Sequence, residues 1–83
     1  MDRTIRIRIN KEISGVQEKN ILHLKGQLIS KGYTDIIHIH DHDEEFYVNS
    51  FIVSAAKSEE AIEMIELYRD TKNLSQILIL LAN

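Results

Sequence analysis

The chain contains 83 residues, of which 43% are hydrophobic and 28% are charged, a composition typical of a folded globular domain and not of a disordered chain. It has no cysteine for disulfides or thiolate metal sites, its apolar runs are far shorter than the roughly 18 residues of a membrane-spanning helix, and its net charge of −3 disfavours nucleic acid as a partner. A chain of this length suits one domain, which we expect over residues 1–83. The first eight residues lack the apolar segment of a signal peptide, so we expect the domain to be located in the cytoplasm.

A first strand is expected over residues 3–9, because isoleucine alternates there with polar residues. A period of two places the isoleucines on one face of the strand and Arg6 and Arg8 on the other. The isoleucines are therefore assigned to the core, and the arginines to solvent or a partner.

A helix is expected after this strand. Ser14 and Gln17 have the spacing of a capping box, in which each side chain accepts a hydrogen bond from the backbone N–H of the other residue. Gly32 follows the last apolar position and suits the left-handed conformation of a C-terminal cap. The apolar stripe between them comprises Ile21, Leu24 and Leu28, broadened by Leu22 and Ile29.

Residues 34–55 are expected to form a β-hairpin around which the chain is organised. In its first arm, residues 34–40, isoleucine alternates with histidine, and a carboxylate-rich turn follows. The second arm, residues 45–55, is rich in β-branched and aromatic residues and has apolar residues on both faces, which indicates a central strand. We assign Tyr47 and Phe51, which share one of these faces, to the core.

A second helix is expected from Ser58, a suitable N-cap, to Asn73. Residues 74–82 are too few and too rich in isoleucine for an independent helix, and they predict a buried fourth strand. The resulting order β-α-β-β-α-β is that of a ferredoxin-like α+β domain, with a four-stranded antiparallel sheet and both helices on one face.

Three histidines of the hairpin form a candidate metal site. His38 and His40 stand two apart on a strand, so their imidazoles share a face about 7 Å apart and suit Zn²⁺ or Ni²⁺. His42 lies about 13 Å from His38 along a regular strand and joins the site only if the turn folds it back. The alternative interpretation is that all three histidines form a solvated sheet edge beside the acidic turn.

The sheet face away from the helices is a candidate interaction surface. Phe46, Val48 and Ile52 share one face of the second hairpin arm, and an apolar centre with a polar border is typical of protein interfaces. We expect Arg6, Arg8 and the histidines to form that border. Modest exposure of isolated apolar residues is the alternative, and a register shift of one residue would exchange the two faces.

No nucleophile elbow, phosphate-binding glycine loop or interpretable acid–base pair occurs, so the sequence predicts no enzymatic activity. The favoured hypothesis is a regulator, adaptor or inhibitor that contacts another protein or a second copy of itself, as a homodimer, through its open sheet face or a sheet edge. This hypothesis requires no cofactor. Its alternatives are a transition-metal-binding module that uses His38 and His40, and a domain that senses a small ligand.

Overall fold

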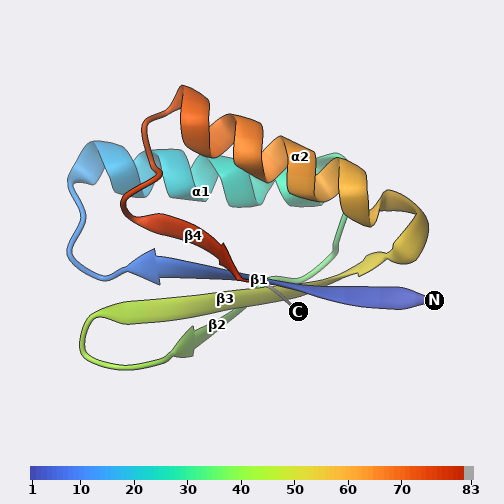
Figure 1. Cartoon of the computed structure of the whole chain (residues 1–83), viewed down its shortest axis with the longest axis horizontal. Coiled ribbons are helices and arrows are strands. Elements are labelled where there is room, and N and C mark those ends of the chain that lie inside the picture. Colours follow the sequence, from blue (N-terminus) through green and yellow to red (C-terminus); the bar gives the residue numbers. More distant parts are fainter. Residues whose placement is uncertain (82–83) are drawn as a thin grey trace.

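The computed structural model describes residues 1–81, which form six elements in the order β-α-β-β-α-β. The four strands are β1 (Asp2–Asn10), β2 (His38–Asp41), β3 (Phe46–Ser54) and β4 (Leu78–Leu81), and they form one sheet in the order β2-β3-β1-β4. The helices α1 (Gly15–Ser30) and α2 (Ala55–Thr71) lie over the same face of this sheet (Figure 1). The predicted α+β class, with one four-stranded antiparallel sheet and two helices, is confirmed.

Each helix connects two parallel strands that are separated by a third strand. β3 lies between β1 and β2, and β1 lies between β3 and β4, and every neighbouring pair is antiparallel. The helix α1 joins β1 to β2, and α2 joins β3 to β4. The two central strands are nine residues long, whereas the two edge strands are four residues long.

The core lies between the sheet and the two helices. The isoleucine row of β1 is buried there, as predicted, against the interior faces of β3 and of both helices. Complete burial of one such side chain contributes about 1.5–3 kcal/mol to folding. The apolar stripe of α1 is narrower than expected, because Leu22 and Ile29 are exposed. The central members of the core are Ile5, Ile7, Ile9, Ile21, Leu24, Leu28, Phe51, Val53, Ala61 and Ile65.

The first arm of the hairpin is shorter than predicted, because residues 34–37 lie outside β2. The backbone N–H groups of Tyr33 and Thr34 donate to the Leu28 carbonyl oxygen at 3.0 and 3.4 Å, which holds the chain at the end of α1. The Thr34 hydroxyl donates to the Ile36 carbonyl oxygen at 3.2 Å. Such local bonds compete with strand pairing, so the ladder begins only at His38.

The helix α2 begins at Ala55, directly after β3, with Ser54 as its N-cap. The prediction that Ser58 is the N-cap is wrong, because Ser58 is buried within the helix and its hydroxyl donates to the Ala55 carbonyl oxygen at 3.0 Å. A serine in this position satisfies its hydroxyl within the preceding turn. The expected end is confirmed, since Thr71 ends the helix and Asn73 has a left-handed φ of 56°.

The last strand also begins later than predicted. The backbone N–H groups of Ile77 and Leu78 donate to the Leu74 carbonyl oxygen at 3.0 and 2.8 Å, so residues 74–77 form a turn. Leu74 is completely buried, and this turn therefore belongs to the core. The predicted end of the strand, at residue 82, lies outside the described residues.

The start of α1 is confirmed in detail. The Gln17 N–H donates to the Ser14 hydroxyl oxygen at 3.1 Å, and the Ser14 N–H donates to the Gln17 side-chain oxygen at 2.9 Å. At the other end, Gly32 has a φ of 79°, as expected of a C-terminal cap. The capping box thus satisfies two N–H groups that the helix itself leaves unpaired.

Replacement of the capping serine should destabilise the protein. We expect Ser14→Ala to lower the free energy of unfolding by about 1 kcal/mol, because the Gln17 N–H loses its acceptor. Ser54→Ala is a matched control, since Ser54 is also an N-cap residue but its side chain makes no capping hydrogen bond. The control should change stability by less than about 0.5 kcal/mol in urea unfolding. Equal losses in both variants would contradict the prediction.

Candidate functional site

The sheet face away from the helices, here called the open face, receives side chains from all four strands. Residues paired directly across an antiparallel sheet point to the same face. Arg8 pairs with Val48 of β3 and with Ile79 of β4, and Val48 in turn pairs with His40 of β2. All five residues predicted for the interaction surface therefore share this face. Its apolar, cationic and imidazole side chains are Phe46, Val48, Ile52, Ile79, Leu81, Arg6, Arg8, His38 and His40.

The apolar part of the open face is larger than the sequence predicted. Ile52 is 56% exposed, and Phe46 and Val48 are half-buried beside it on β3. The missed contribution comes from Ile79 and Leu81 of β4, of which Ile79 is 37% exposed. Residues 77–82 are apolar throughout, so the sequence holds no alternation that would distinguish the two faces of β4.

The arginines lie within the apolar surface and not along its border as expected. β1 is flanked by β3 and β4, so Val48 and Ile79 lie on either side of Arg8. Arg6 similarly lies between Ser50 and Leu81. The order of the strands determines this arrangement, and strand order depends on long-range contacts.

Arg8 is held against an aromatic ring but is not fully paired. Its guanidinium carbon lies 4.3 Å from the centroid of the Phe46 ring, a cation–π geometry. Its Nε is buried without a hydrogen-bond partner among residues 1–81, and no carboxylate of that part of the chain forms an ion pair with Arg6 or Arg8. Buried donors are normally satisfied, so the Nε of Arg8 is an exception. The guanidinium charge is not neutralised by a carboxylate of the described residues, and a guanidinium suits an acidic group of a partner.

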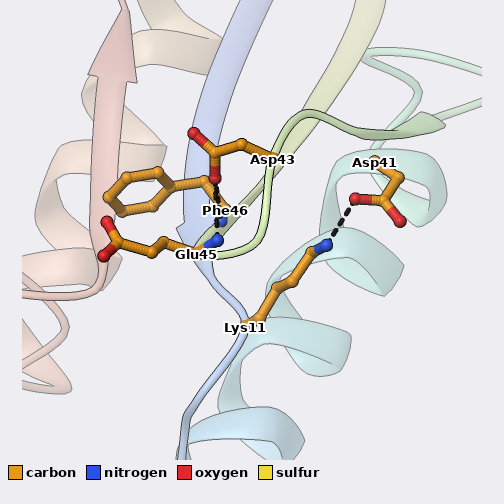
Figure 2. A network of polar contacts seen from close by, with 5 residues as sticks. All are labelled: Lys11, Asp41, Asp43, Glu45 and Phe46. Atoms are coloured by element: carbon orange, nitrogen blue, oxygen red, sulfur yellow. Dashed lines mark hydrogen bonds and ion pairs between the residues drawn. The ribbon is translucent and has the colours of Figure 1, made fainter.

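The hairpin turn at one end of the open face is fixed by polar contacts (Figure 2). One carboxylate oxygen of Asp43 accepts hydrogen bonds from the backbone N–H of Glu45 at 2.8 Å and of Phe46 at 2.9 Å. The Lys11 ammonium donates a hydrogen bond to the Asp41 carboxylate in an ion pair, and this hydrogen bond raises the pKa of Lys11. The backbone N–H of Lys11 donates to the Glu45 carbonyl oxygen at 2.8 Å. Together these contacts position Phe46.

Two of the three predicted metal ligands are brought together. His38 and His40 lie on the open face of β2 with their ring centroids 6.4 Å apart, and the Ser50 hydroxyl lies 3.4 Å from Nε2 of His40. His42 lies beyond the end of β2, where its N–H donates to the Phe46 carbonyl oxygen at 3.1 Å. Within residues 1–81, no three His, Asp, Glu or Cys side chains are arranged as a metal site.

A polar residue beneath α1 escaped the sequence prediction. Asn49 is 2% exposed on the helix side of β3, and its Oδ1 has no partner among the described residues. It lines a groove of about 440 Å³ with Lys25, whose pKa is lowered by burial, and with Ile39 and Tyr47. Tyr47 is exposed, contrary to its assignment to the core. If the protein senses a small ligand, this groove is the place for its site. The sequence signal for the buried polar residue was the position of Asn49 two residues before Phe51, which puts both on the same face of β3.

Comparison of the chain with models of known protein families, with curated proteins and with solved structures found no match. Over residues 1–81, no helix has the length and apolar character needed to cross a bilayer.

The turn contacts predict the acid titration of Asp43. Hydrogen bonds from the backbone N–H of Glu45 and then of Phe46 stabilise the carboxylate and hold the pKa of Asp43 below its usual value of 3.8. A pKa that is lower in the folded than in the unfolded state contributes stability at pH values above 3.8. This contribution is lost as the pH falls through the folded pKa.

An NMR titration of the side-chain carboxyl carbon measures this pKa directly. The variant Asp43→Asn keeps an acceptor oxygen for the turn but has no proton to gain, so it should lack this part of the acid destabilisation. An Asp43 pKa at or above 3.8 would contradict the role assigned to the two N–H groups.

Proposed function

We propose that the protein is a cytoplasmic, non-enzymatic domain of the ferredoxin-like type that acts by protein–protein contact through its open face. It forms a homodimer and serves as a regulator, adaptor or inhibitor. The order of the six elements, the two split β-α-β units and the placement of both helices on one face support the ferredoxin-like assignment.

The observation that carries this proposal is the set of apolar side chains that the helices leave uncovered on β3 and β4. Isolated exposed apolar residues are ordinary in globular proteins. Here Val48 and Ile79 lie on either side of Arg8 in register, and Ile52 extends the same face along β3. Larger exposed apolar areas mark interaction sites, and arginine is enriched at protein interfaces.

Charge complementarity favours a second copy of the chain as the partner. The arginines lie within the open face, and the exposed carboxylates of Glu44 and Glu45 lie at its Phe46 end. A second copy that packs against this face can therefore offer carboxylates to Arg6 and Arg8. Association also benefits a small domain, because a chain of this size buries a limited share of its surface by folding alone.

Transition-metal binding by His38 and His40 is a second candidate function. It is favoured by the position of both imidazoles on one face of β2, with 6.4 Å between the ring centroids. Both side chains are exposed, so an ion from solution can reach them. Imidazole nitrogen suits Zn²⁺ and Ni²⁺.

A charge placed on the open face should weaken self-association. We expect Ile52→Glu to raise the dissociation constant of the dimer at least about tenfold, because a carboxylate would be buried among apolar side chains. The matched control is Leu67→Glu, since Leu67 is 69% exposed on α2, which lies on the other side of the sheet. Sedimentation equilibrium measures both constants. A wild-type protein that remains monomeric at high concentration would contradict the proposal, as would equal weakening by both substitutions.

Metal addition tests the second candidate. We expect Zn²⁺ added to tag-free protein to shift the imidazole NMR signals of His38 and His40, and we expect the double variant His38→Ala, His40→Ala to lose this response. His23, on α1, serves as an internal control because its Nδ1 is already 2.8 Å from the Tyr68 hydroxyl. Equal shifts of all four histidines would indicate nonspecific binding and contradict a site at β2.

A further inference from the structure

The outer edge of β2 has backbone groups that pair with no described residue. β2 is the terminal strand of the sheet, and its His38 and His40 are paired with β3. Residues of an antiparallel strand alternate between positions that hydrogen-bond to the neighbouring strand and positions that do not. The backbone N–H of His42 donates to the Phe46 carbonyl oxygen, so His40 and His38, which follow at steps of two, also bond to β3. The N–H and C=O groups of Ile39 and Asp41 consequently point away from β3. Such an edge is a template for another strand.

The histidine pair is incomplete as a metal site within one chain. A protein-bound Zn²⁺ ion is usually held by four ligands in a tetrahedron, or by three ligands and a water molecule. His38 and His40 supply two, and residues 1–81 offer no third His, Asp, Glu or Cys in a suitable arrangement. The nearby carboxylate of Asp41 is in an ion pair with Lys11. The missing ligands must therefore come from outside the described chain.

We propose that a second copy of the chain completes this site by pairing its β2 with the first β2, so that one Zn²⁺ ion binds His38 and His40 of both copies. This inference rests on the second candidate function, metal binding by the histidine pair. The two copies meet along the strand edge and not through the apolar part of the open face, although His38 and His40 lie on the β2 side of that face.

The register of this pairing follows from the backbone geometry. With a two-fold axis at Ile39, the outward N–H and C=O groups of Ile39 exchange hydrogen bonds with those of the same residue in the second copy. His38 then lies opposite His40 of the second copy in a non-hydrogen-bonded pair, where Cα atoms are about 4.5 Å apart. The four imidazoles form a group that is about 7 Å long and shares one face of a continuous sheet. Zinc–nitrogen bonds of about 2.0–2.1 Å are within reach of side chains at that spacing.

The pairing also accounts for an exposed apolar side chain. Ile39 is 59% exposed on the helix side of the edge strand. In the paired arrangement it packs against Ile39 of the second copy, so the same contact buries an apolar group and satisfies the strand edge. Because β2 is only four residues long, this contact alone is weak, and the metal ion supplies the remaining stability.

The test measures mass and zinc content together, in tag-free protein that carries Ile52→Glu so that the open face does not contribute to association. Sedimentation equilibrium with ZnCl₂ should show a twofold increase in mass and one zinc ion for every two chains, and EDTA should reverse both. His38→Ala and His40→Ala should each abolish the increase in mass and weaken zinc binding by at least about tenfold. The matched control His42→Ala should retain both properties.

A backbone variant separates strand pairing from metal ligation. Ile39→Pro removes the outward N–H at the two-fold axis but keeps both imidazoles, and proline is tolerated on sheet edges. We expect this variant to keep the far-ultraviolet circular dichroism of the parent and to lose the twofold increase in mass.

The outcomes distinguish this inference from the functions on which it builds. One zinc ion per chain without an increase in mass would overturn the two-copy site and leave metal binding in place. Absence of zinc binding would overturn both. Loss of binding in His42→Ala would overturn the assigned ligands. These experiments do not test association of the wild-type chain through the open face, which the Ile52→Glu and Leu67→Glu variants test separately.

Discussion

Burial of the isoleucine row of β1 is the constraint on which the rest of the structure depends. Ile5, Ile7 and Ile9 are covered by the helices, and β1 is paired on both sides. Because side chains alternate strictly along a strand, burial of these residues forces Arg6 and Arg8 to the opposite face. Both helices lie over one face of the sheet (Figure 1), and the isoleucines are buried in the core on that face, so the arginines face away from the helical layer.

The two surfaces proposed for binding arise from this one-sided packing. The central strand β3 carries apolar residues on both faces, of which the helices cover only one. The short β2 leaves an edge on which imidazoles and outward backbone groups lie together. The turn at Asp43 connects the two surfaces, since its hydrogen bonds fix Phe46 at the end of the open face and also close the β2–β3 hairpin.

Local patterns predicted the elements, and long-range contacts decided what the prediction missed. The capping box at Ser14 and the alternation in β1 are local signals, and both were interpreted correctly. The sequence left the hairpin register open, because β3 is apolar on both faces, and the register in the structure places the expected surface residues on one face. The loss of residues 34–37 from the strand depends on hydrogen bonds to the end of α1, and the central position of Arg8 depends on strand order. Neither feature is visible in a short sequence window. Ser58, the only N-cap that the sequence analysis proposed for α2, is buried within that helix, and the helix begins earlier, at Ala55, because Ser54 is the N-cap.

We propose that the open face is buried against a second copy of the chain. An NMR dilution series, with amide signals assigned residue by residue, would detect this contact. Self-association through the open face should give concentration-dependent shifts in β1, β3 and β4, at Arg8, Val48 and Ile79 above all, and should leave the outer surface of α2 unchanged. Shifts confined to the helices, or spectra that are independent of concentration, would contradict it.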